Sequence, residues 1–158
     1  MGPSPESDTK VLGPPDLELG PLRIWIHEYQ FACYESTDDA NWLKATIIMD
    51  LPGKAWVRAD GPWLRATDLA DWMRQCEQMH KLLEGAAFFG SPAEALTVSM
   101  RMVDRLGHFR TEVQMEIHHQ PNQHFHQFWL EDLDQTYLGL LVEQGKRLLR
   151  HFPVRGEV

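Results

Sequence analysis

The sequence predicts an α+β fold, in which a meandering antiparallel β-sheet of about six or seven strands carries two main α-helices on one side. Three observations predict it. Apolar and polar residues alternate in several short segments that follow one another without intervening helices, which favours antiparallel pairing. Two longer segments, at about 67–84 and about 135–151, have apolar residues spaced by three and four. The 158 residues, 43% of them hydrophobic, have the size and composition of one domain with a real core.

The chain is predicted to begin with a flexible, proline-rich tail over residues 1–16, followed by a single α+β domain over residues 17–158. The first strand falls in "PLRIWIHEYQFACYE", where Leu22, Ile24 and Ile26 recur with a period of two. Two further strands are expected in "WLKATIIMDL" and "KAWVRADGPWL", separated by a turn at Pro52 and Gly53.

Helix signals bracket the two longer segments. Thr67 and Asp68 suit a helix start, and Gly85 suits a stop. Asp134 can cap the second helix by accepting backbone N–H bonds, and Pro153 prevents its continuation. Between the helices, "GAAFFG", "ALTVSMRMV", "HFRTEVQMEIHH" and "HFHQFWLE" are typical of strands.

The composition narrows the class of function. Fifteen lysines and arginines against 23 acidic residues give a net charge of −8, which argues against direct nucleic-acid binding and suits a basic protein partner. No secretory signal or membrane-length apolar run is present, so we expect a cytoplasmic protein. The sequence has no nucleophile elbow, phosphate loop or H-E-x-x-H zinc helix, and we expect neither catalysis nor a cofactor.

Histidines gather in the hairpin predicted from the last two strands. With a loop over residues 120–123, His119 would face His124, and His126 would share their side of the sheet. Two or three imidazoles at a hairpin tip could bind zinc or nickel. A wet hairpin tip also tolerates histidines that bind nothing, and no cysteine or carboxylate joins this face, so we favour histidines without a metal.

The other face of this hairpin carries Glu112, Glu116, Phe125 and Trp129. Aromatic residues among carboxylates can form a protein-binding surface. Because large aromatic side chains are seldom left bare, we expect instead that a helix covers Phe125 and Trp129.

The stretch "STDDANWL" at residues 36–43 is predicted to be a turn that leads into a buried strand, since Ser, Thr, Asp and Asn hydrogen-bond their own backbone. Within it, "DANWL" resembles the D-x-N-W-L signature of the WapI-type immunity proteins. "WLRATDLADWMRQCEQM" is similar to their L-x-x-x-E-L-x-x-L segment, although Asp71 and Trp72 fit it loosely. "FWLEDLDQTYLGLLVEQGKRLLRHFPVR" resembles their closing F-x-L-D-Q-T-x-L segment and final helix. The resemblance spans roughly residues 12–155.

This resemblance implies a non-catalytic immunity protein that binds and occludes the C-terminal domain of a contact-delivered toxin, such as a basic nuclease. It identifies no contact residues. From the residues themselves we single out the acids in and next to the 36–43 stretch, together with residues of the hairpin face, as candidate partner contacts: Glu35, Asp38, Asp39, Glu112, Glu116 and Trp129. Two alternatives stay open, an interaction domain without a toxin partner and a small metal-binding protein that uses the 118–126 histidines.

Overall fold

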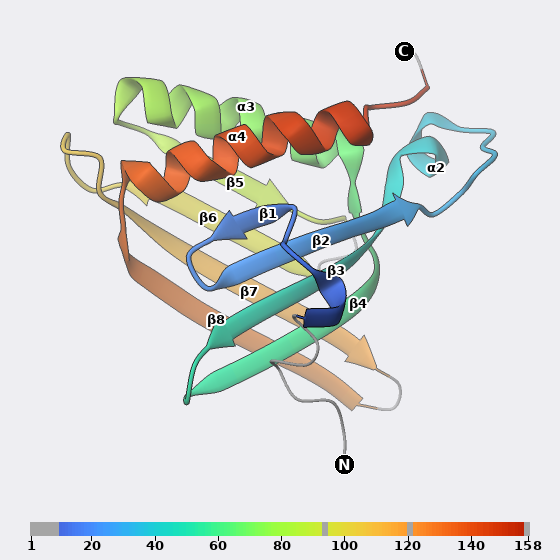
Figure 1. Cartoon of the computed structure of the whole chain (residues 1–158), viewed down its shortest axis with the longest axis horizontal. Helices are drawn as coiled ribbons and strands as arrows, with labels where there is room; N and C mark the ends of the chain where they lie inside the picture. The colour runs from blue at the N-terminus through green and yellow to red at the C-terminus, as the bar shows by residue number, and fades with distance from the viewer. Residues whose placement is uncertain (1–9, 93–94, 120–121, 157–158) are drawn as a thin grey trace.

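Two four-stranded antiparallel sheets face each other, and two long helices lie across one end of them (Figure 1). The computed structural model of the chain describes residues 10–92, 95–119 and 122–156. The first sheet has the order β1 (Leu17–Leu19), β2 (Leu22–Tyr29), β3 (Trp42–Leu51), β4 (Ala55–Arg65). The second has the order β5 (Ala86–Gly90), β6 (Leu96–Met102), β7 (Phe109–His119), β8 (Asn122–Leu133). The helices are α2 (Thr37–Asn41), α3 (Ala66–Leu82) and α4 (Gln135–His151).

The predicted α+β class and the antiparallel pairing are confirmed, but the single sheet of six or seven strands is wrong. The chain leaves the first sheet at Arg65, passes through α3, and starts a separate sheet at Ala86. The inner faces of the two sheets bury each other, with residues such as Ile47 and Val113 in one shared core. The alternation of apolar residues marks a strand's buried face, but it does not say whether a sheet or a helix covers that face.

Helix α4 spans the predicted residues, and the Asp134 carboxylate accepts a hydrogen bond from the Thr136 N–H at 2.9 Å. Helix α3 ends before the predicted residue 84. Leu83 adopts a left-handed backbone with φ of 52°, and its N–H donates to the Met79 carbonyl at 2.9 Å. This left-handed cap closes the helix two residues before Gly85, the residue predicted to stop it.

Helices α3 and α4 pack against each other at Gly145. A Cβ atom placed there would lie 2.0 Å from the sulfur of Met73. A side chain at position 145 would therefore require the buried Met73 side chain to move.

The helices also line the outermost strands. The Gln75 amide on α3 donates to the Phe88 carbonyl at 3.2 Å and accepts from the Phe88 N–H at 2.9 Å. On α4, the Gln144 side-chain oxygen accepts a hydrogen bond from the Glu18 N–H at 2.8 Å. The edges of β5 and β1 are thus covered by side-chain amides that occupy backbone groups of the two strands.

Part of the predicted N-terminal tail makes hydrogen bonds to β2. The Trp25 indole N–H donates to the Gly13 carbonyl at 3.1 Å, and the Asp16 carboxylate accepts from the Ile26 N–H at 2.7 Å. Residues 1–9 of the predicted tail lie outside the described residues. No helix within the described ranges is both long enough and apolar enough to span a membrane.

Candidate functional site: the α2 loop and the outer face of the second sheet

The segment between β2 and β3, residues 30–41, is here called the α2 loop. It contains a short helix in place of the predicted turn, because the Ser36 hydroxyl accepts a hydrogen bond from the Asp39 N–H at 3.2 Å and caps α2. Trp42 begins β3, as the sequence predicts. In Figure 1 the α2 loop projects beyond the strands, near the C-terminal end of α4.

Asn41 joins the α2 loop to the end of the chain. Its side-chain N–H donates to the Arg155 carbonyl at 2.9 Å, and its side-chain oxygen accepts from the Arg155 N–H at 2.8 Å. Only 1% of Asn41 is exposed, so this amide replaces water as the partner of the Arg155 backbone. Both atoms of the amide that can hydrogen-bond are used in this pairing.

The Arg155 side chain completes the connection. Its guanidinium donates to the carbonyls of Ala40 and Phe31, both at 2.8 Å. It also stacks over the rings of Tyr29 at 3.6 Å and Tyr34 at 4.8 Å. We call this set of contacts, together with the Asn41 pairing, the Arg155 clasp. It fixes the backbone of the α2 loop at both ends, and nothing in the local sequence pattern around residue 155 indicates it.

The clasp presents a surface of mixed character. Phe31 and Tyr34 are 38% and 43% exposed. Glu35 follows Tyr34 in the sequence, Asp39 lies in α2, and both acidic residues are exposed. In the part of the chain that the structure describes, Glu35 and Asp39 form no ion pair. The Asp38 side chain lies outside the described residues. Unpaired carboxylates next to exposed aromatic rings are available to a positively charged protein partner.

The predicted hairpin face is the outer face of the second sheet. Glu112 lies opposite Trp129 and Glu116 opposite Phe125, as same-face neighbours. Phe125 and Trp129 are 59% and 65% exposed, so the expectation that a helix covers them is wrong. The helices lie across the end of the two sheets instead, at the β1 and β5 edges (Figure 1).

This outer face has mixed charge. The Glu112 carboxylate is held by hydrogen bonds from the amides of Gln114, at 2.8 Å, and Gln127. Arg110 lies further along the same strand on the same face and approaches Glu131 at 3.8 Å. The two groups of predicted contact residues therefore lie on separate surfaces, the α2 loop and the second sheet, and the α2 loop is the one whose described acids are unpaired.

The histidine hairpin has a different register from the predicted one. His119 lies opposite Asn122, and Ile117 rather than His119 lies opposite His124. Strand pairing includes Asn122 and Gln123, which the prediction placed in the loop, and this shifts the register by two residues and keeps the faces. The rings of His124 and His126 stack in parallel with centroids 6.1 Å apart. Among the described residues no group of three His, Cys, Asp or Glu could hold a metal, and the His119 side chain lies outside them.

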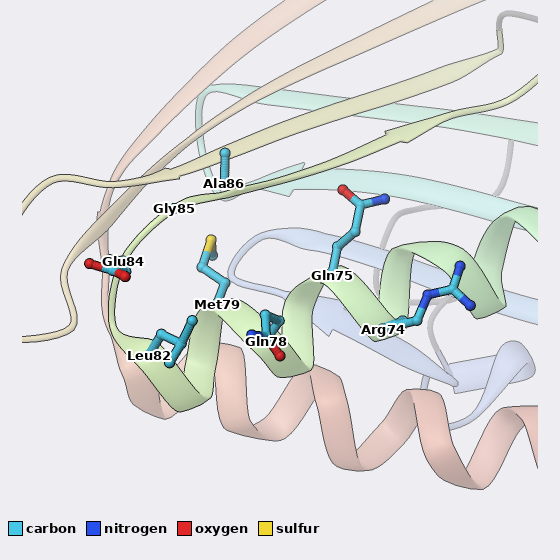
Figure 2. A pocket seen from close by; sticks show the side chains of 8 residues that line it. All are labelled: Arg74, Gln75, Gln78, Met79, Leu82, Glu84, Gly85 and Ala86. Atoms are coloured by element: carbon cyan, nitrogen blue, oxygen red, sulfur yellow. The ribbon is translucent and has the colours of Figure 1, made fainter.

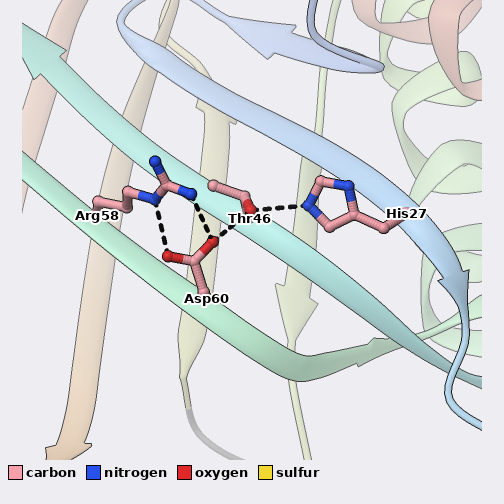
Figure 3. Close-up of polar contacts among 4 residues, drawn as sticks. All are labelled: His27, Thr46, Arg58 and Asp60. Carbon is pink, nitrogen blue, oxygen red and sulfur yellow. Dashed lines mark hydrogen bonds and ion pairs between the residues drawn. The ribbon is translucent and has the colours of Figure 1, made fainter. Parts of the chain in front are cut away.

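A chain of polar side chains crosses the outer face of the first sheet (Figure 3). The Thr46 hydroxyl donates to Asp60 at 2.5 Å, so His27 Nε2, 2.8 Å from the same hydroxyl, is the donor to it. Burial raises the pKa of Asp60, but the hydrogen bonds from Arg58 and Thr46 outweigh it and hold the pKa below its ordinary value. Since Thr46 is only 1% exposed, a substrate cannot reach its hydroxyl. The hydrogen-bonded side chains instead join the three strands β2, β3 and β4.

The buried cysteine is equally unsuited to nucleophilic attack. Burial raises the pKa of the Cys76 thiol to about 12, so the thiolate is scarce at neutral pH.

A groove of about 430 Å³ lies beside the last turns of α3 (Figure 2). It is lined by Arg74, Gln75, Gln78, Met79, Leu82, Glu84, Gly85 and Ala86. Arg74 pairs with Asp71, and Glu84 lies 3.9 Å from Arg105, so the charged lining residues already have partners. The groove thus lacks a convergent set of free polar groups, which a substrate site needs.

Comparison with known proteins defines the class. The model of the "Immunity protein WapI-like family" matches residues 16–153, from the segment before β1 to the residue after Phe152. The chain therefore belongs to the WapI-like immunity protein family. No curated protein and no solved structure gave a significant match.

Proposed function

We propose that this protein neutralises a toxin by binding its toxic domain through the α2 loop. Membership of an immunity family supports the class of partner. The observation that carries the choice of surface is that the exposed carboxylates of Glu35 and Asp39 form no ion pair among the described residues and share the α2 loop with the exposed rings of Phe31 and Tyr34. The Arg155 clasp supports it further, because a loop that is already ordered loses less conformational entropy when it binds.

The proposed partner is a basic domain, such as that of a nuclease toxin. Enzymes that cut nucleic acid bind phosphates with lysine and arginine, and this chain carries a net charge of −8. Carboxylates on the α2 loop would approach the basic substrate-binding surface, while Phe31 and Tyr34 supply apolar contact area. Inhibition would then follow from occlusion of the toxin's active site, with complementary charge increasing the rate of association.

The test uses the toxin domain encoded next to this chain's gene, with association measured at low and at moderate salt. The double variant Glu35→Lys and Asp39→Lys should bind at least about tenfold more slowly at low salt, and the difference should shrink as salt rises. The dissociation rate should change less, because exposed charges act mainly on association.

The matched control is Glu84→Lys with Glu143→Lys, which changes net charge by the same amount on exposed side chains elsewhere. Glu84 follows the C-terminal end of α3, and this end of the helix is the one farther from the α2 loop (Figure 1). Equal slowing by both double variants would mean that overall charge, not the α2 loop, governs association. Absence of any binding by the wild-type chain would refute the immunity role itself.

The outer face of the second sheet is the second proposed contact surface, through Glu112, Glu116 and Trp129. It is favoured by the large exposed area of Trp129. Trp129→Ala should leave association unchanged if the α2 loop alone binds the toxin, and should speed dissociation if both surfaces do.

A further inference from the structure

Two of the four sheet edges in this fold are covered by helices, and a third is interrupted by a bulge. Side-chain amides of α4 and α3 occupy backbone groups of β1 and β5. On β4, Pro62 lies in a bulge, where the register shifts between Leu43 and Ala45 of β3. Covering helices, proline and bulges are the devices by which proteins prevent strands from pairing with other chains.

The fourth edge, β8, has none of these devices along most of its length. Within the described residues β8 pairs only with β7, in continuous register from Leu130 to Asn122. Its twelve residues contain no proline or glycine. Residues 122–125 and Trp129 are exposed. A long, exposed edge strand that carries aromatic side chains is a site for pairing with another strand.

We propose that β8 pairs with β8 of a second copy of this chain, antiparallel and centred on Gln127. When a two-fold axis perpendicular to the sheet relates the two strands, residues that lie opposite each other have side chains on the same face of the sheet. Side chains alternate between the faces along a strand, so two opposed residues must both have odd or both have even numbers. Centring on Gln127 sets Phe125 opposite Trp129 of the second copy, and Trp129 opposite its Phe125. The two most exposed aromatics of the second sheet, at 59% and 65%, then cover each other as cross-strand pairs.

These aromatic pairs are the self-complementary feature of the β8 edge, and they are the reason that a second copy is the proposed occupant. The charged residues do not add to it, because this register sets His124 opposite Leu130 and Glu131 opposite Gln123 of the second copy.

The resulting dimer has one continuous sheet of eight strands across the two copies. It goes beyond the proposed function and does not depend on toxin binding by the α2 loop, which lies away from β8 in Figure 1. The dimer would cover Trp129, so it competes with the second proposed contact surface. One strand-to-strand contact is smaller than a standard interface of about 1,600 Å², so the dimer should form in a concentration-dependent way.

Site-specific cross-linking tests both the contact and its register, in a Cys33→Ser background because Cys33 is exposed. Gln127→Cys would face its own copy with Cα atoms roughly 4.5–5.5 Å apart, a separation that a disulfide spans. Gln123→Cys is the matched control on the same exposed strand. Its copy would lie eight residues along the ladder, about 27 Å away. We expect a disulfide-linked dimer from Gln127→Cys and none from Gln123→Cys.

Sedimentation of the full chain over a range of concentrations supplies the second readout. Wild-type protein should shift from monomer to dimer, and Trp129→Lys should weaken the association at least about tenfold, because a charge on the edge opposes pairing. Trp129 is exposed, so the variant should fold, and circular dichroism checks this. A wild-type chain that stays monomeric throughout, or equal cross-linking at residues 123 and 127, would overturn the proposal. So would protection of β8 amides by a bound toxin domain in a monomeric protein, since the occupant would then be a toxin strand.

Discussion

Replacing Asn41 by alanine tests the Arg155 clasp in terms of stability. The change removes two hydrogen bonds, at 2.8 and 2.9 Å, from a side chain that is 1% exposed. Each bond contributes about 1 kcal/mol net, and the Arg155 backbone groups left without a partner add a desolvation cost. The free energy of unfolding should therefore fall by about 2–3 kcal/mol, which lowers Tm by roughly 5–10 °C in a chain of this size.

Urea unfolding measures this loss, and a double-mutant cycle isolates its source. The second change is deletion of residues 155–158, which removes the groups that Asn41 binds. In the shortened chain Asn41 has lost its two bonds to residue 155, so Asn41→Ala should cost about 2 kcal/mol less than in the full chain. Arg155→Ala is the control, because it removes the stacking and guanidinium bonds but keeps the backbone groups that Asn41 pairs with. An equal cost of Asn41→Ala in the full and the shortened chain would refute the coupling between the α2 loop and the chain end.

Two further predictions concern packing and pH. Gly145→Ala should destabilise the protein by about 1–3 kcal/mol, because the new methyl group meets the Met73 sulfur between α3 and α4. In a Met73→Ala background the same change should instead stabilise the protein by up to about 1 kcal/mol, because alanine is a better helix former than glycine. Thermal unfolding of the four proteins shows whether the sign of the effect reverses. The pKa of Asp60 is lower in the folded protein than in the unfolded chain. The ionised Asp60 therefore stabilises the folded protein at pH values above the unfolded-state pKa, and this stabilisation is lost as the pH falls through the folded-state pKa. Asp60→Asn should accordingly flatten the acid limb of a stability-against-pH curve, and an unchanged acid limb would mean that the Asp60 pKa is not lowered.

The sequence predicts single elements better than their arrangement. Helix α4 has its predicted bounds because local chemistry sets both ends, with Asp134 accepting the first N–H groups and Pro153 following the last turn. The division into two sheets depends on whether β4 pairs with β5 or faces it, and local patterns carry no information on that choice. The end of α3 was missed for a related reason, since leucine rarely adopts the left-handed backbone that Leu83 has.

The candidate site shows the same limit. Glu35 and Asp39 could be singled out because acidic residues in a polar turn are exposed in most folds. The Arg155 clasp could not, because Asn41 and Arg155 are 114 residues apart and neither belongs to a motif with a known pairing. Exposure of Phe125 and Trp129 was predicted wrongly on the general rule that large aromatics are covered. That rule describes isolated chains, and a strand edge that is completed by a second copy would be an exception to it.

The stretch "DANWL" contains both residues that stabilise the fold and a residue whose side chain has no structural role among the described contacts. Asn41 holds the Arg155 backbone, the Trp42 ring lies under the Arg65 guanidinium at 5.8 Å, and Leu43 is fully buried in the core. These three residues are explained by the fold alone. Asp39 is exposed and points to no partner among the described residues, so it is free to vary with the partner without cost to the fold. If the α2 loop binds a toxin, the residues that choose the toxin should therefore lie before Asn41, at positions such as Glu35 and Asp39. Exchanging residues 35, 38 and 39 between two members of the family should transfer toxin preference while Tm changes little, because Tyr34, Ser36, Asn41 and Arg155 would be kept.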